Sequence, residues 1–151
     1  MIFIFFIFAK DSRNQLTRES SSSIHGFAES GDVVFLNDFN AAKEQAILER
    51  KPLVAFFTLS GNESCKRSFE LFGNQEIRRL AKYFVCVSVD GALSSQICES
   101  YKVNSFPTVM ILDAEGKEIQ RLAGKETKEQ LSIQMHIAIQ LSTSVNKNKI
   151  R

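Results

Sequence analysis

Residues that build disulfide frameworks and metal sites are scarce in this sequence. It has three cysteines, Cys65, Cys86 and Cys98, none of them in a C-x-x-C spacing, and only two histidines. These numbers exclude a disulfide framework and a zinc site made of recognisable ligand pairs. We therefore expect neither a metal nor a cofactor. We expect Cys86 and Cys98 to pack in the core, where cysteine commonly behaves as a small hydrophobic residue.

An excess of one charge and a long apolar segment are also missing. The chain has 19 lysines and arginines against 17 aspartates and glutamates, a net charge of +2. Such a balance does not produce the field that attracts nucleic acid or a membrane surface. The longest uninterrupted apolar run, residues 1–9, is far shorter than the ~20 residues that cross a bilayer. We therefore expect no nucleic-acid partner and no membrane span.

The two ends of the chain differ in composition from its middle. Residues 1–9 have the length of a signal-peptide core, but no basic residue precedes them and a cut after Ala9 would place bulky Ile7 at a small-residue position. A secretory and a cytoplasmic location therefore both stay open. The following residues are polar and rich in serine, which is typical of a flexible linker. We predict a leader and linker over residues 1–30, one folded domain over 31–142 and a disordered tail over 143–151.

Strands and helices alternate in the predicted domain. Apolar runs favour strands, and spaced apolar residues after a capping side chain favour helices. The run 52–58 is apolar almost throughout, which predicts a central strand buried on both faces. A hairpin turn at 113–117 predicts that the next strand is antiparallel to the one before it. The predicted elements are, in order, strand 33–36, a helix capped by Asp38 or Asn40 that ends near residue 50, strand 52–58, a helix from 62 to 81 interrupted at 73–74, strand 84–90, helix 94–101, strand 109–113, strand 118–122 and helix 127–141.

This order of elements, together with two short motifs, resembles the thioredoxin fold. The motifs are Asn-Glu-Ser-Cys-Lys at residues 62–66, after the central strand, and Ser-Phe-Pro-Thr at residues 105–108, before a later strand. The resemblance extends over residues 33–141 and is nearest to the group of thiol–disulfide interchange domains. It implies an α/β fold with a central mixed β-sheet flanked by helices on both faces.

The active-site signature of that family is only half present. The signature is Trp-Cys-x-x-Cys-Lys, and laid on this sequence it places Gly61 at the tryptophan and Asn62 at the first, attacking cysteine. Cys65 and Lys66 fall on the second cysteine and the lysine after it, and Phe56 falls where the family has a buried acid. The resemblance therefore leaves Cys65, at the position of the resolving cysteine, as the one candidate catalytic residue.

Dithiol exchange needs an attacking thiolate and a second thiol that resolves the mixed disulfide. Asn62 can cap a helix but cannot attack sulfur. We expect Cys65 to be a shielded, structural thiol and the domain to be redox-impaired. The alternative is a monothiol oxidoreductase in which Cys65 forms mixed disulfides that an external thiol resolves. A third possibility is that Cys86 or Cys98 supplies the resolving thiol.

The resemblance also implies a peptide-binding surface beside the missing cysteine. In the family, a cis proline lies next to the active-site loop, and the backbone of the residue before it pairs with bound peptide. Carried to this chain, the surface consists of Gly61, Asn62, Glu63, Ser64, Phe106 and Pro107. We expect a monomer that binds a protein or peptide segment there.

Two other interpretations of these residues stay open. One is that Pro107 only starts a strand and shapes the core. The other is that Asn62 is glycosylated, because Asn62-Glu63-Ser64 fits the N-x-S acceptor pattern, provided that the chain is secreted.

Overall fold

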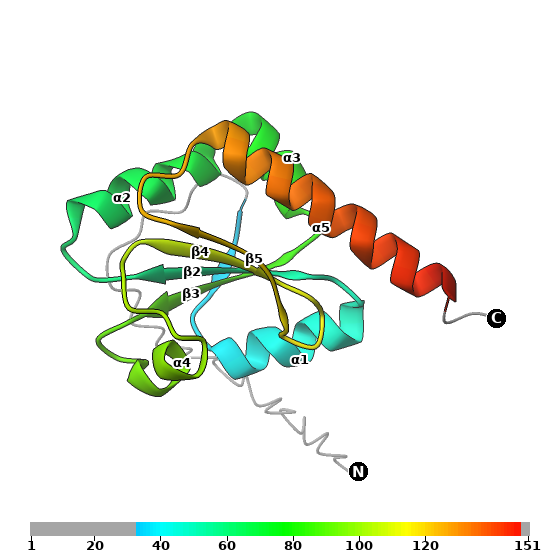
Figure 1. The fold of residues 1–151 in the computed structure, drawn as a ribbon, viewed down its shortest axis with the longest axis horizontal. Coiled ribbons are helices and arrows are strands. Elements are labelled where there is room, and N and C mark those ends of the chain that lie inside the picture. The colour runs from blue at the N-terminus through cyan, green and yellow to red at the C-terminus, as the bar shows by residue number, and fades with distance from the viewer. Residues whose placement is uncertain (1–32, 149–151) are drawn as a thin grey trace, which may run out of the picture.

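The domain is built around a five-stranded mixed β-sheet with the strand order β1-β3-β2-β4-β5 (Figure 1). The structure, a computed structural model, describes residues 33–148. Strands β1, β2 and β3 run parallel, and β4 and β5 are antiparallel to their neighbours. The strands are β1 (Phe35–Leu36), β2 (Leu53–Thr58), β3 (Val85–Asp90), β4 (Thr108–Leu112) and β5 (Glu118–Ala123).

Helices cover both faces of this sheet (Figure 1). Helices α1 and α4 lie on one face, and α2, α3 and α5 lie on the other. This arrangement confirms the predicted α/β thioredoxin fold. The helices are α1 (Phe39–Glu49), α2 (Glu63–Phe69), the short 3₁₀ turn η1 (Glu70–Gly73), α3 (Gln75–Ala81), α4 (Ser95–Ser100) and α5 (Lys128–Asn148).

The central strand β2 divides the core into two layers. All six of its residues are buried. Because side chains alternate across a strand, Phe56 enters the cluster beneath α2, α3 and α5, whereas Phe57 enters the cluster beneath α1 and α4. The run 52–58 is apolar almost throughout because both faces of β2 are covered by these two layers of the core.

Polar side chains fix where the helices begin, as the sequence indicated. Asp38 caps α1 by accepting hydrogen bonds from the backbone N–H groups of Asn40 and Ala41, at 2.9 and 3.0 Å. Asn74 caps α3 in the same way, by accepting from the N–H of Glu76. The cap at Asn74 explains why the long predicted helix breaks there and restarts as α3.

The prediction of a disordered tail from residue 143 is wrong for the part of the tail that the structure describes. Helix α5 continues through these residues to Asn148. No glycine or proline ends it, and the hydroxyls of Ser142, Thr143 and Ser144 donate hydrogen bonds to backbone carbonyls about one turn earlier. Polar residues here were interpreted as a solvated tail, but their side chains bond within the helix.

Other predictions for the chain ends lie outside the described residues. These are the apolar leader and polar linker of residues 1–30 and the last three residues of the tail. Within residues 33–148, no helix is long and apolar enough to cross a membrane.

Candidate functional site: the loop after β2 and the Phe106–Pro107 segment

Three segments that are distant in sequence meet where β2 and β3 end. They are the loop after β2, the loop after β3, and the residues before β4. Gly91, just after β3, makes the contact possible, because a Cβ at this glycine would lie 2.4 Å from Cζ of Phe106 and 3.3 Å from Cδ2 of Leu59. The lack of a side chain at Gly91 thus lets the Phe106 ring lie close to the backbone of that loop.

The turn into α2 is shaped by Gly61 and Asn62. Gly61 has φ +77°, a conformation that residues with a Cβ rarely adopt. The Asn62 side chain caps α2 by accepting hydrogen bonds from the N–H groups of Ser64 and Cys65, at 2.9 and 3.1 Å. Asn62, which the resemblance places at the attacking cysteine, therefore has a structural task as a helix cap, and Glu63 and Ser64 beside it are exposed.

Cys65 is completely buried, with none of its surface exposed. It belongs to the core cluster that also contains Phe56, Phe69 and Phe72. In the described structure, a disulfide in solution therefore cannot reach its sulfur without a local opening of α2.

Phe56 occupies the position of the family's buried acid and belongs to an aromatic cluster. Its ring centroid lies 5.6 Å from that of Phe69 and 6.0 Å from that of Phe72. Phe35 completes the cluster from β1, at 5.2 and 5.0 Å from the same two rings. This place beneath α2 is therefore filled by apolar packing, which a carboxyl group for proton transfer would disrupt.

The other two thiols are poorly placed to resolve a disulfide at Cys65. All three cysteines are free and buried. Cys98 lies in the core on the opposite face of the sheet. Cys86 lies four residues before the end of β3, ~13 Å along the strand from the edge where α2 begins. The interpretation of Cys86 or Cys98 as a resolving thiol therefore loses support.

Burial also governs the ionisation of these two thiols. It raises the pKa of Cys86 to about 12. For Cys98, burial is again the main cause of a raised pKa, and the nearby Asp90 carboxylate adds to it. Both thiols stay protonated and unreactive at neutral pH.

Phe106 and Pro107 form the other half of the site. The peptide bond between them is cis. Pro107 is buried, and its carbonyl accepts a hydrogen bond from the N–H of Gly124 at 3.2 Å. In contrast, no described residue forms a hydrogen bond with the backbone N–H or C=O of Phe106.

The structure brings the predicted surface residues to one edge of the sheet and adds residues that the sequence analysis missed. We call Gly61, Asn62, Glu63, Ser64, Phe106 and Pro107 the loop–proline surface. Leu59 and Gly91 adjoin it through Phe106, and Leu93, which is 86% exposed, lies in the same loop as Gly91. The position of Leu93 in a predicted strand-to-helix loop was the available signal, whereas the contact between Gly91 and Phe106 follows only from the fold.

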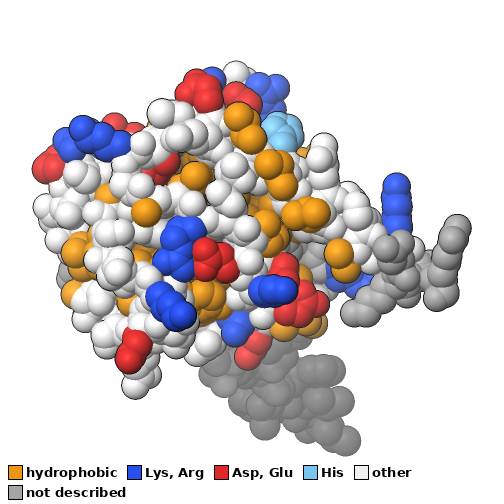
Figure 2. Space-filling view, in the orientation of Figure 1, with side chains coloured by type: hydrophobic (Ala, Val, Ile, Leu, Met, Phe, Trp, Pro, Cys, Tyr) orange, Lys and Arg blue, Asp and Glu red, His pale blue; other side chains and the backbone are white. Residues whose placement is uncertain are grey.

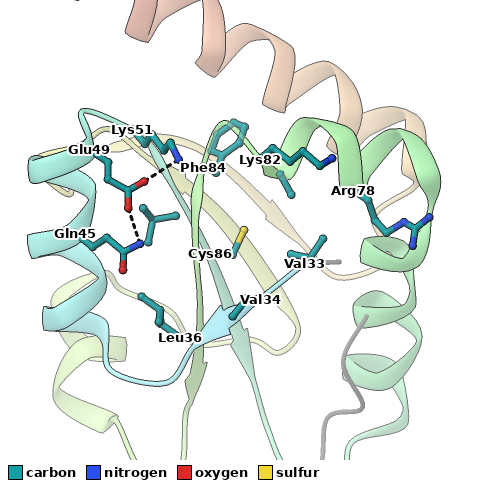
Figure 3. A pocket seen from close by; sticks show the side chains of 12 residues that line it. Val33, Val34, Leu36, Gln45, Glu49, Lys51, Arg78, Lys82, Phe84 and Cys86 are labelled. Carbon is teal, nitrogen blue, oxygen red and sulfur yellow. Dashed lines mark hydrogen bonds and ion pairs between the residues drawn. The ribbon is translucent and has the colours of Figure 1, made fainter. Parts of the chain in front are cut away.

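A cavity of about 300 Å³ lies away from this surface, near the start of β3 (Figure 3). It is lined by Val33, Cys86 and several charged side chains, among them Glu49 and Lys51. Glu49 and Lys51 form an ion pair of 2.7 Å, and Gln45 donates a second hydrogen bond to Glu49. The cavity lies at the start of β3, the opposite end of the strand from the loop–proline surface, and therefore does not extend that surface. Across residues 33–148, no cluster of histidine, cysteine and acidic residues could hold a metal.

The fold and this site agree with the comparison to known families. Residues 39–138 match the model of the thioredoxin-like domain family. The chain therefore belongs to the thioredoxin-like domain family. A comparison with curated protein sequences found no match.

Solved thioredoxin structures resemble the chain in fold. A thioredoxin from Thermus thermophilus has 17% identity and a TM-score of 0.61, over 69% of this chain and 85% of that one. A thioredoxin from Malassezia sympodialis has 19% identity and a TM-score of 0.60, over 76% of this chain and 97% of that one. The likeness spans nearly the whole of those proteins and establishes the fold that thiol–disulfide oxidoreductase domains use.

The contact between Gly91 and Phe106 makes a prediction about stability. Gly91→Ala should lower the free energy of unfolding in urea by about 1–3 kcal/mol, because the new methyl group overlaps the ring. In a Phe106→Ala background the same change should cost less than about 1 kcal/mol. An equal cost in both backgrounds would show that the ring does not lie over Gly91.

The buried thiol of Cys86 predicts a pH dependence. In the unfolded chain a cysteine loses its proton near pH 9, whereas in the fold Cys86 keeps it to about pH 12. The contribution of the protonated Cys86 thiol to the free energy of unfolding is therefore fully present below pH 9. Above pH 9 this contribution falls, by up to about 1.4 kcal/mol per pH unit. Urea unfolding between about pH 7 and 10.5 should give a flatter profile for Cys86→Ala than for the native chain. If the stability of both proteins fell in parallel with pH, the raised pKa of Cys86 would be contradicted.

Proposed function

We propose that this chain is a redox-impaired thioredoxin-like domain that binds a protein or peptide segment through the loop–proline surface. The family membership supplies the general class, a domain with the fold of thiol–disulfide oxidoreductases. The residues of the site support the two narrower parts of the proposal, the redox impairment and the peptide binding, by separate observations.

The chemistry of dithiol exchange lacks its first step. An attacking thiolate must form a mixed disulfide before a second thiol can release it. Asn62 stands at the attacking position, and its amide oxygen is occupied by two backbone N–H groups of α2. Cys65, the remaining thiol, has no exposed surface. Both facts support a domain that does not turn over disulfides.

Peptide binding is supported above all by the backbone of Phe106. Its N–H and C=O have no hydrogen-bond partner among the described residues, and the segment lies at the edge of the sheet where β2 ends, since Thr108 pairs with Phe57. An extended peptide satisfies such groups by adding strand-like backbone hydrogen bonds, each worth about 1 kcal/mol net. Exposed apolar surface at Leu93 offers a neighbouring contact for a peptide side chain.

The monothiol alternative would use the same site differently. It requires an accessible Cys65 that accepts a disulfide and an external thiol that resolves it. The complete burial of Cys65 counts against this alternative. The experiments below separate the two functions.

Redox impairment is tested by restoring the missing thiol. The native chain should not accelerate the reduction of insulin by dithiothreitol, whereas Asn62→Cys should accelerate it by about 10-fold or more over the native chain, because it recreates a dithiol with Cys65. Asn62→Ser is the matched control, since serine keeps a capping oxygen but adds no thiol. Turnover by the native chain, lost in Cys65→Ser, would support the monothiol enzyme instead.

Peptide binding is tested with an array of extended peptides, followed by NMR titration of the best binder. We expect chemical-shift changes at residues 61–64 and 106. A version of the peptide that is N-methylated at the contacting residues should bind about 5- to 30-fold more weakly, because it loses one or two backbone hydrogen bonds. Leu48→Glu, on the outer face of α1, is the control and should bind normally. Shifts confined to other surfaces would contradict the proposal.

A further inference from the structure

Glu126, in the loop between β5 and α5, holds its carboxylate in an unusual place. Figure 2 shows aspartate and glutamate side chains at the surface, interspersed with lysine and arginine. In contrast, Oε2 of Glu126 is buried and accepts no hydrogen bond from the described residues. Oε1 accepts a hydrogen bond from the hydroxyl of Ser68 on α2, whose side chain is buried too. A carboxylate is therefore kept against α2 although one of its oxygens has lost water without gaining a partner.

The segment that carries this carboxylate is fixed at both ends. We call residues 124–127 the strap, and Figure 1 shows this connection beside α2. At one end, the N–H of Gly124 donates to the carbonyl of Pro107 at 3.2 Å. At the other end, Thr127 and Gln130 form a reciprocal capping box, with distances of 3.0 and 3.3 Å from backbone N–H to side-chain oxygen, from which α5 begins. The strap therefore presents the carboxylate to α2 from a defined position.

The buried face of α2 depends on this contact. Cys65 and Ser68 lie one turn apart on that face, and both are buried. Among residues 33–148, the bond from Ser68 to Glu126 is the one side-chain hydrogen bond that ties α2 to a distant part of the chain. Because α2 has only seven residues, its own hydrogen bonds cannot keep it folded. Its position over Cys65 therefore rests on apolar packing and on the strap.

We propose that the strap gates the thiol of Cys65: while Glu126 holds Ser68, the start of α2 covers the sulfur, and when that bond breaks it lifts and exposes the sulfur. The end of α2 is the pivot, because the ring of Phe69 stays packed on that of Phe56, at a centroid distance of 5.6 Å. Release is favoured by the orphaned Oε2 of Glu126, which regains water when the strap moves outward.

Gating gives Cys65 a different route to solvent from that of Cys86. Both thiols belong to the same core cluster, but Cys86 lies on β3, between β1 and β2. Exposing Cys86 requires the sheet to come apart, which is global unfolding, whereas lifting α2 is a local opening of lower free energy. The inference does not depend on peptide binding. It is compatible with redox impairment, because a thiol that is exposed for a small fraction of the time, with no second thiol beside it, turns over no disulfide.

The test compares the alkylation of these two thiols in the folded full chain. Iodoacetamide reacts with a thiolate, whose sulfur displaces iodide, so a buried thiol is alkylated only when it opens to solvent. Peptide mass spectrometry measures Cys65 and Cys86 separately in the same sample. We expect Cys65 to react about 10-fold or more faster than Cys86. Both should react far more slowly than in the urea-unfolded chain.

Removing the bond between α2 and the strap should open the gate. Ser68→Ala and Glu126→Ala should each raise the alkylation rate of Cys65 by about 10-fold, the effect expected for one hydrogen bond to a charged group. Glu129→Ala is the matched control and should leave that rate unchanged, because this carboxylate lies on α5 and its side chain is 70% exposed.

A second control separates gating from a general loss of stability. Met110→Ala opens a cavity beneath α1 and α4, on the face of the sheet opposite to α2. It should raise the alkylation rate of Cys86 by about 10-fold or more and leave the rate of Cys65 nearly unchanged, because Met110 stays packed when only α2 opens.

Three results would overturn the proposal. One is an equal rate at Cys65 and Cys86 in the native chain, which would mean that only global unfolding exposes Cys65. Another is a Cys65 rate that Ser68→Ala leaves unchanged, which would show that the bond does not hold α2 closed. The third is a Cys65 rate that Met110→Ala raises as much as the Cys86 rate. Circular dichroism checks that each variant is folded.

Discussion

The complete burial of strand β2 is the constraint on which the rest of the structure depends. This strand pairs with β3 on one side and β4 on the other, so its backbone groups are satisfied only within the sheet. Its side chains need cover on both faces, which α2, α3 and α5 supply for Phe56, and α1 and α4 for Phe57. Because β2 is central, its end also fixes where α2 begins and where the residues before β4 must lie.

The same constraint explains the character of the site. With Phe56 in the aromatic cluster, the space beneath α2 is apolar and well filled, and Cys65 is part of that filling. Asn62 then stabilises the helix start instead of carrying out chemistry. The site then consists of the turn at Gly61 and the peptide groups of Phe106, for which no residue in 33–148 provides a hydrogen bond.

Much of the fold could be predicted from local patterns. The two-sided apolar run of β2, the cap at Asp38 and the hairpin turn with Gly116 at φ +87° are each determined by a few neighbouring residues. The end of α5 was mispredicted, because serine and threonine in a polar stretch fit a solvated tail as well as a helix. The role of Gly91 was missed because it depends on Phe106, which lies fifteen residues further along the chain.

The sequence by itself determined which residue types stand at each position, among them Asn62 three residues before Cys65, and through its resemblance to a known family it indicated the class of fold. Only the tertiary structure decided that Cys65 has no exposed surface and that Leu59, Gly91 and Phe106 meet. Burial and contact depend on which elements pack against each other, and the spacing of residues within one element does not specify its neighbours. The sequence therefore specified the side chains of the site, and the pairing of the strands brought them to one edge of the sheet.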